Sequence, residues 1–229
     1  MKGKMWSEPF ISPVRTNKKG FRLYPFHQIT KKIILLILIT VFALTVYGQR
    51  FHGGPMLGLS ATQIDGDNLG GYNKPGIRGG AWVNTSISKN IIMQLELEFI
   101  QKGSKISQNE LKNQEYYHAR LNYIQAPILA KTSLLPKLSG EAGIAGSYLV
   151  ASLEDKDGGG FLEAEPPFDL FELSGLLGLN YNLNENFTAN VRLNYSLLPI
   201  RPHPGGQYYW LNRGQYNNAM LFSLYYRID

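Results

Sequence analysis

The stretch "IIMQLELEF", Ile91–Phe99, decides the fold because its side chains alternate in polarity along its length. Every odd-numbered residue is apolar, whereas Gln94, Glu96 and Glu98 take the even positions after Ile92. Successive side chains of a β-strand point to opposite faces of its sheet, so a period of two predicts a strand. In a soluble sheet the glutamates would face water; in a membrane barrel they would face the interior, and the apolar row would face lipid.

The same alternation recurs through the chain after residue 49 and predicts eight strands. They cover Pro55–Ile64, Gly76–Ser86, residues 91–102, Arg120–Thr132, Lys137–Val150, Leu170–Asn182, Phe187–Leu197 and Ala219–Ile228. In the fourth strand, Pro127 has no N–H to give to the ladder and the alternation slips beside it, so we expect a bulge there. Tyrosines near the strand ends are expected to form an aromatic girdle at the membrane interface: Tyr123, Tyr148, Tyr181, Tyr195 and Tyr226.

The connections between these strands alternate in length. The long ones cover roughly residues 65–75, 103–119, 154–168 and 199–216, and the short ones read "SISKN", "SLLP" and "LNEN". Bacterial outer-membrane barrels have an even number of strands, long extracellular loops and short periplasmic turns. The sequence therefore predicts an all-β fold, an eight-stranded antiparallel transmembrane β-barrel with up-and-down meander order. A soluble periplasmic β-sandwich is the rival interpretation.

The N-terminal segment has the pattern of an export signal. A lysine pair precedes an apolar stretch, Ile33–Tyr47, which is shorter than the roughly 20 residues of a membrane-spanning helix. The stretch fits the hydrophobic region of a secretory signal with cleavage after Gly48, and an uncleaved anchor helix is the alternative. We therefore assign 1–48 to a leader with a secretory signal peptide and 49–229 to an outer-membrane β-barrel domain. Residues 1–30 are expected to reflect a start codon assigned too far upstream, with a genuine long leader as the alternative.

The uneven distribution of charge excludes a nucleic-acid partner. Eight of the 23 Lys and Arg residues lie in residues 1–48 against one of the 17 Asp and Glu residues, so the remaining chain has 15 bases and 16 acids. A nearly neutral body has no basic footprint for nucleic acid. The chain has no cysteine, which excludes disulfides and thiolate metal sites. With the signal removed, the barrel is expected in the outer membrane of a Gram-negative bacterium, with both mature termini in the periplasm.

The barrel interpretation also predicts which charges meet inside. The inward faces of the predicted strands carry four acids and four bases. This predicted lumenal network consists of Glu96, Glu98, Glu141, Glu172, Arg78, Arg120, Arg192 and Arg227. Equal numbers suit an enclosed polar interior, because a buried charge without a partner is strongly destabilising.

Two segments resemble a known family. "KPGIRGGAWVNTSISKNIIMQLELEFIQKGSK", Lys74–Lys105, is similar to the second and third strands of PorT-like outer-membrane β-barrel proteins of the porin family, which combine a glycine-rich strand with a Q-x-E-L strand ending in QKG. "LNYIQAPILAK", Leu121–Lys131, resembles their Y-x-x-x-P fourth strand. The resemblance implies an eight-stranded barrel. One member takes part in protein secretion, a role that the resemblance does not transfer. This chain departs from the usual terminal aromatic residue, since it ends at Asp229.

The sequence selects no catalytic residue, cofactor or metal site. His52, His118 and His203 remain after the leader, and the spacing of serines and acids around them picks out no triad. The acidic segment 154–169 contains "DKDGGG" without the full ligand spacing of a calcium loop. We therefore interpret it as a solvated surface loop.

The fourth long loop is a candidate recognition surface. It combines aromatic and arginine side chains, which are enriched at contact surfaces: Arg201, Tyr208, Tyr209, Trp210, Arg213 and Tyr216. The alternative is an interfacial aromatic girdle. The expected surroundings are outer-membrane lipid and lipopolysaccharide, with a protein or glycan partner at the extracellular loops.

The function predicted from these features is that of a small non-enzymatic outer-membrane protein. It would act as a structural anchor or as a partner-binding platform through its four long loops. The alternatives are a narrow or gated pore for small solutes, a factor that assists protein secretion and, less favoured, an enzyme that modifies outer-membrane lipid.

Overall fold

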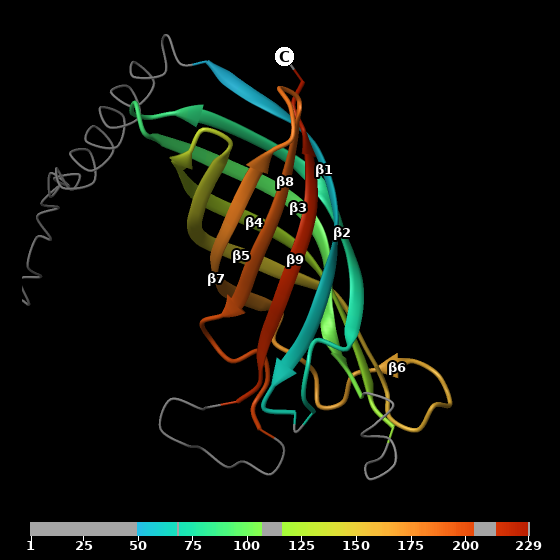
Figure 1. The fold of residues 1–229 in the computed structure, drawn as a ribbon. Helices are drawn as coiled ribbons and strands as arrows, with labels where there is room; N and C mark the ends of the chain where they lie inside the picture. The colour runs from blue at the N-terminus through green and yellow to red at the C-terminus, as the bar shows by residue number, and fades with distance from the viewer. Residues whose placement is uncertain (1–49, 68, 107–115, 204–213, 229) are drawn as a thin grey trace, which may run out of the picture. The chain divides into compact units, whose positions relative to one another are not determined.

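The computed structural model describes residues 50–67, 69–106, 116–203 and 214–228, and these form an antiparallel barrel (Figure 1). Its strands are β1 (Phe51–Asp65), β2 (Lys74–Ser86), β3 (Ile91–Lys105), β4 (His118–Leu135), β5 (Leu138–Asp155), β7 (Phe171–Asn182), β8 (Phe187–Ser196) and β9 (Tyr216–Tyr226). The two-residue strand β6 (Leu162–Glu163) pairs with β5 in the connection to β7. Within the described ranges, no helix is both long and apolar enough to cross a membrane.

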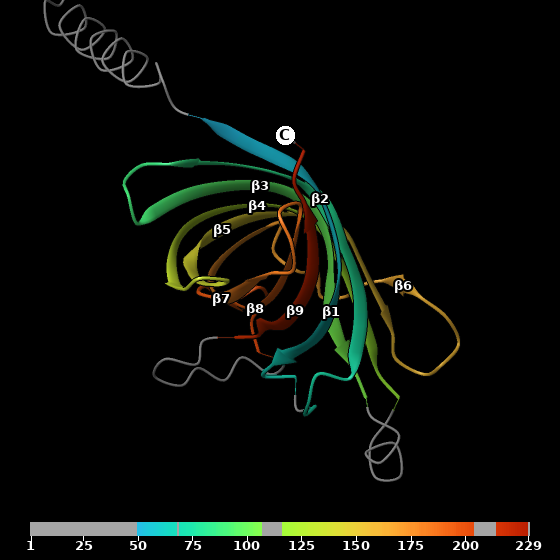
Figure 2. The ribbon, with the colours of Figure 1, turned by 45° about the horizontal axis from the view of Figure 1, so that its top comes forward.

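Each long strand pairs with its neighbours in sequence, and β1 pairs with β9 while β4 pairs with β5, so the sheet is closed (Figure 2). Closure satisfies the backbone N–H and C=O groups that lipid cannot. The predicted eight-stranded meander barrel is therefore confirmed. We call the end with the three short turns, where β1 begins and β9 ends, the turn end; the opposite end is the loop end. The predicted leader, 1–48, lies outside the described residues.

The β3–β4 pairing corrects the prediction of a bulge at Pro127. The register stays constant from Ile91↔Thr132 to Lys105↔His118, and Pro127 only interrupts the ladder. The shift lies instead in the β4–β5 pairing, where Asn122 pairs with Ala151 but Tyr123 pairs with Leu149. Val150 is therefore the additional residue of a bulge in β5.

This change of register decides which residues enter the barrel. Without a slip in β4, its odd-numbered residues face inward, so Tyr123 and Gln125 are fully buried. The prediction of Tyr123 in the aromatic girdle is wrong for this reason. In β5 the bulge inverts the alternation toward the loop end, and Glu154 is turned inward with 3% of its surface exposed.

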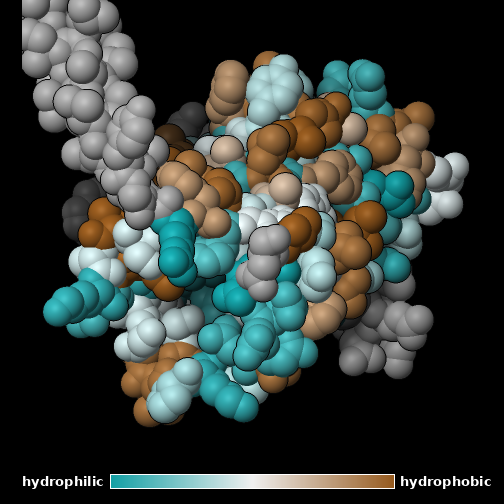
Figure 3. Space-filling model, turned by 90° about the horizontal axis from the view of Figure 1, so that it is seen from above, coloured by the Kyte–Doolittle hydropathy of each residue, from teal (hydrophilic) through white to brown (hydrophobic). Residues whose placement is uncertain are grey.

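The outer surface is an apolar band that faces lipid. Leu57, Leu97, Ile128, Ile144, Leu177, Val191 and Phe222 are among the large hydrophobic side chains exposed on it. Tyr148 and Tyr195 are exposed toward the loop end of their strands, whereas Tyr181 and Tyr226 are exposed toward the turn end. The view onto the turn end shows hydrophilic side chains gathered in the middle and lower part of this face, and hydrophobic ones mainly over its upper and right-hand parts (Figure 3).

Candidate functional site

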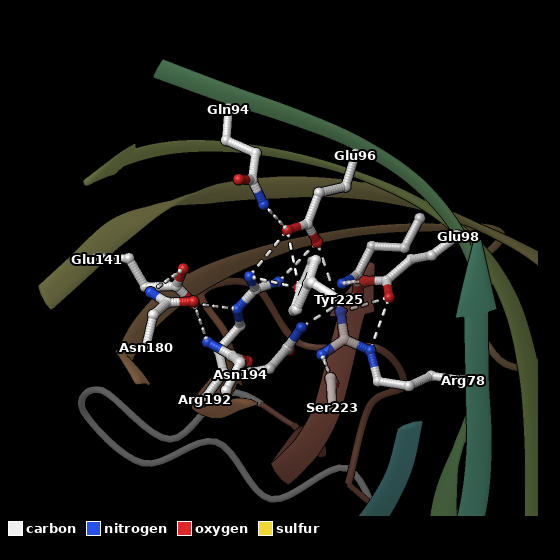
Figure 4. Close-up of polar contacts among 12 residues, drawn as sticks. Arg78, Gln94, Glu96, Glu98, Glu141, Asn180, Arg192, Asn194, Ser223 and Tyr225 are labelled. Atoms are coloured by element: carbon white, nitrogen blue, oxygen red, sulfur yellow. Dashed lines mark hydrogen bonds and ion pairs between the residues drawn. The ribbon is translucent and has the colours of Figure 1, made fainter. Parts of the chain in front are cut away.

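The centre of the barrel is occupied by the Arg192 guanidinium of β8, which is fully buried (Figure 4). It donates to both Glu96 carboxylate oxygens, Nη1 to Oε2 at 2.8 Å and Nη2 to Oε1 at 2.9 Å. Its Nε donates to Glu141 Oε1 at 2.6 Å, and Nη2 also reaches the Tyr225 hydroxyl at 3.0 Å. Charge-assisted, two-pronged hydrogen bonds of this kind are strong and directional, so they fix the three carboxylate oxygens across the lumen.

A second arginine extends this network toward β2. Arg78 Nε donates to Glu98 Oε2 at 2.7 Å, and Nη1 donates to Ser223 Oγ at 2.9 Å. The other Glu98 oxygen accepts a hydrogen bond from Gln125 Nε2 at 2.8 Å. Arg78 Nη2 lies 3.4 Å from Glu96 Oε2, which links the two arginines through one carboxylate.

Two lysines absent from the predicted network add two further cations to these ion pairs. Lys131 Nζ lies 3.2 Å from Glu141 Oε2, on the turn-end side of the network. Lys102 Nζ lies 2.8 Å from Glu172 Oε1, closer to the loop end. Apart from the loop-end pair of Arg201 with Glu154, the buried ion pairs join four bases to four acids, the same numbers that the sequence predicted, although two of the cations differ.

The structure brings together six of the eight predicted lumenal charges and places two elsewhere. Arg120 has the outward parity of β4, because that strand has no slip, and its guanidinium lies 4.2 Å from the Phe161 ring centroid. Its predicted place in the lumen is therefore corrected. Arg227 follows β9 at the turn end, where it lines a hollow with His52 and Asn184.

The loop end of the lumen is closed by a hydrophobic cluster beneath the loops. Its members are Ile64, Ile100, Ala119, Leu121, Tyr123, Leu149, Ala164, Phe168, Ile200, Ala219 and Leu221, with Tyr117 packed against them. Ala164 and Phe168 come from the β5–β7 connection and Ile200 from the β8–β9 connection, so two loops contribute to the closure.

Arg201 ties these loops together and is not a surface residue. It is 5% exposed, donates to Glu154 Oε1 at 2.7 Å and stacks 3.9 Å from the Phe168 ring centroid. Tyr117 donates to the same Glu154 oxygen at 2.6 Å; burial, together with this carboxylate, raises the pKa of the Tyr117 hydroxyl well above its usual value. The predicted role of Arg201 in surface recognition is corrected by this burial.

The other predicted recognition residues fall into two groups. Tyr216 is half-buried at the start of β9 and stacks on Tyr195, with ring centroids 6.1 Å apart. Tyr208, Tyr209, Trp210 and Arg213 lie outside the described residues. In the acidic loop, Asp155 and Asp157 accept hydrogen bonds from the N–H groups of Gly158 and Gly159. Among the residues that the structure describes, no group of three His, Asp or Glu side chains is placed to hold a metal ion.

One family model and several solved structures match this chain. No curated protein matches the chain at a significant level. The crystal structure of Ail, the attachment invasion locus protein of Yersinia pestis, in complex with the heparin analogue sucrose octasulfate is 11% identical, with a TM-score of 0.45 over 78% of this chain and 99% of that one. Neisserial surface protein A is 12% identical, with a TM-score of 0.47 over 79% of this chain and 98% of that one. Residues 39–201 match the family described as outer membrane protein beta-barrel domain. The chain therefore belongs to this family of outer-membrane β-barrel proteins.

Proposed function

We propose that this protein is a non-enzymatic and non-conducting outer-membrane barrel that presents its long loops as a partner-binding platform. The observation that carries the proposal is the filled interior. The side chains of Arg192, Glu96 and Glu141, which are joined by hydrogen bonds, block the middle of the lumen. The hydrophobic cluster that includes Phe168 closes the loop end. An eight-stranded barrel has little internal space beyond its own side chains. The loops are then the part of the molecule that is left to meet a partner.

The proposed orientation places the loop end outside the cell. Both ends of the barrel chain, Phe51 and Tyr226, lie at the turn end (Figure 1). A barrel released from a secretory signal at Gly48 would have this end in the periplasm. Short turns at the same end agree with the rule for bacterial barrels.

Conductance in planar lipid bilayers tests the platform against the pore. We expect the purified protein to give no stepwise conductance above that of a protein-free bilayer, because the Arg192 pairs obstruct the lumen. A general porin inserted by the same procedure serves as the positive control. Stable ohmic steps that scale with the number of inserted barrels would contradict the proposal.

A basic patch at the loop end favours an anionic partner within the outer leaflet. Lys105 and His118 are paired positions of β3 and β4, and Arg120 follows two residues along β4 on the same outward face. His118 and Arg120 both pack against Phe161, with ring and cation distances of 4.9 and 4.2 Å to its centroid. At the margin of the apolar band, the cations of Lys105 and Arg120 are suitably placed for the phosphate groups of lipopolysaccharide.

Removing two charges from this patch tests the lipopolysaccharide interaction. The double variant Lys105→Gln, Arg120→Gln is expected to retain severalfold less lipopolysaccharide per barrel after a detergent wash. The matched control, Lys89→Gln with Lys137→Gln, removes two lysines at the turn end and is expected to retain the wild-type amount. Equal retention by both variants would show that the patch does not hold lipopolysaccharide.

Two alternatives have distinct tests. The PorT-like resemblance of Lys74–Lys105 favours a factor that assists protein secretion, and an export defect in a deletion strain would support it. An outer-membrane enzyme acting on lipid would change the acyl pattern of lipid A between the wild-type and deletion strains, which mass spectrometry detects. The obstructed interior supports neither role, and the platform therefore remains our proposal.

A further inference from the structure

The outer wall of the barrel carries a polar surface near the loop end, where β8, β9 and β1 are neighbours in the sheet (Figure 1). Tyr195, Asn218 and Gln63 are paired positions of these strands and form one outward row. Tyr216 and Asp65 pair in the next outward row toward the loop end. Together with one residue of the β1–β2 connection, these positions form what we call the tyrosine surface: Gln63, Asp65, Tyr72, Tyr195, Tyr216 and Asn218.

The side chains of the tyrosine surface are held in place around one carboxylate. Asp65 accepts hydrogen bonds from Gln63 Nε2 at 2.5 Å and from Asn218 Nδ2 at 3.2 Å. The Tyr195 hydroxyl interacts with the same carboxylate, and its ring stacks on that of Tyr216 with the two planes 8° apart. Asn218 Oδ1 in turn accepts a hydrogen bond from the Tyr72 hydroxyl at 2.8 Å. The surface is therefore ordered before any ligand arrives, which lowers the entropic cost of binding.

The charge and the remaining hydrogen-bonding capacity of this surface favour a ligand rich in hydroxyl groups. Among the described residues, no Lys or Arg forms an ion pair with Asp65, so the surface is negative and disfavours phosphate. A carboxylate has about four acceptor positions, and a phenol oxygen accepts as well as donates. Sugar hydroxyls can donate to these oxygens, while the C–H face of a sugar ring packs on an aromatic ring. Tyr72 and Tyr195 are 38% and 42% exposed, so their rings are open to such contact.

The position beside the apolar band indicates that the sugar belongs to a lipid-anchored molecule. The next outward row toward the turn end consists of Leu193, Met220 and Ala61, all of them apolar. Tyrosines at such a boundary lie at the level of the lipid headgroups. A molecule whose acyl chains cover the apolar row therefore has its sugars at the level of the tyrosine surface. A soluble glycan would instead meet the loops first.

We propose that the tyrosine surface binds the core saccharide of a lipopolysaccharide molecule in the outer leaflet. The rings of Tyr72 and Tyr195 pack against the sugar, and Asp65 accepts hydrogen bonds from its hydroxyl groups. This inference rests on the proposed orientation, with the loop end outside the cell, and it adds a sugar contact to the phosphate contact of the basic patch on β3 and β4. The alternative is a girdle that only anchors the barrel. Such a girdle would respond equally to lipids with and without sugar.

Retention of two lipids by the purified full-length protein separates these alternatives. Lipopolysaccharide of the host bacterium is compared with lipid A prepared from it, which keeps the acyl chains and their phosphates but has no core sugar. After a detergent wash, we expect the wild type to retain severalfold more lipopolysaccharide than lipid A. Tyr195→Leu keeps a large apolar side chain on the wall but removes the ring, and it is expected to abolish this difference without changing the retention of lipid A. Tyr181→Leu makes the same change at a tyrosine that is 48% exposed at the turn end, and it is expected to behave as the wild type.

Saturation-transfer NMR with dephosphorylated core oligosaccharide tests the sugar contact without any lipid phosphate. In a detergent that has no aromatic protons, irradiation of the aromatic protons of the protein should saturate the ring C–H protons of the sugar. We expect severalfold less transfer in Tyr195→Leu than in Tyr181→Leu. The Lys105→Gln, Arg120→Gln variant should retain less lipid A but leave this transfer unchanged, so the two lipopolysaccharide contacts can fail separately. Equal retention of both lipids by the wild type, equal loss in the two tyrosine variants, or no transfer to the sugar would overturn the saccharide site.

Discussion

Replacing Glu96 with leucine is expected to lower the free energy of unfolding of the barrel by about 3–5 kcal/mol, the usual effect of breaking a buried ion pair. Glu96 accepts two hydrogen bonds from Arg192, one from Gln94 at 2.6 Å and one from the Tyr225 hydroxyl at 2.9 Å. Leucine replaces none of these acceptors, so Arg192 keeps only Glu141 as a close anionic partner. The buried arginine then carries charge that the interior does not compensate.

Urea unfolding of the barrel refolded in lipid vesicles measures this loss. Glu185→Leu makes the same chemical change in the exposed β7–β8 turn and is expected to alter stability by less than about 0.5 kcal/mol. Adding Arg192→Met to Glu96→Leu should recover part of the lost stability, because an apolar pair can replace a buried ion pair. If Glu96→Leu and Glu185→Leu lowered the free energy of unfolding by equally small amounts, the charge of Arg192 would be compensated by a group other than Glu96.

The alternation within single strands was enough to predict much of the interior. In β3 the period of two places Glu96 and Glu98 on the same face of the sheet. Because the sheet closes into a barrel, this face is enclosed. The same reasoning places Arg192 of β8 and Glu172 of β7. These residues lie in strands whose alternation is unbroken, so a local pattern carries the full information about their direction.

Residues whose direction depends on the position of a register shift were assigned to the wrong face. The slip expected at Pro127 led to the wrong assignment of inward and outward faces in β4. It placed Arg120 inside the barrel and Tyr123 outside, and it left Lys131 without an assigned face. The real bulge is at Val150, an ordinary valine between Leu149 and Ala151, and no glycine or proline beside it indicates the irregularity. Lys102 is the last residue of the predicted third strand and lies on its inward face, so the alternation already indicated its place although the predicted network did not include it.

The loop-end closure was unpredictable for a different reason. Arg201 and Glu154 are 47 residues apart, and their 2.7 Å contact depends on how the β8–β9 connection folds over the end of β5. A surface role for Arg201 was inferred from the composition of its own loop, which contains no information on the bulge that turns Glu154 inward. Contacts between loops are set by tertiary structure, whereas strand direction is set by local alternation.

Replacing Leu177 with arginine is expected to lower the free energy of unfolding in a bilayer by about 2–4 kcal/mol, the effect of a cation on the lipid face near the bilayer midplane. Leu177 lies near the middle of β7, is 62% exposed and is flanked by Ala142 and Leu193 on the neighbouring strands. On a soluble protein, arginine at so exposed a position would be nearly neutral. The size of the effect therefore reports what surrounds the outer face.

The position of the substitution along the barrel axis provides the control. Leu183→Arg makes the same change in the β7–β8 turn, where the side chain is 51% exposed, and it is expected to lower the free energy of unfolding by no more than about 1 kcal/mol. Guanidinium titration of both variants in vesicles measures the difference. If hydrocarbon surrounds the outer face, the penalty must fall from Leu177 to Leu183, because only the first arginine is held away from water. Equal penalties at the two positions would mean that the apolar band is not the surface that contacts the bilayer core, and the assignment of inner and outer faces would have to be reversed.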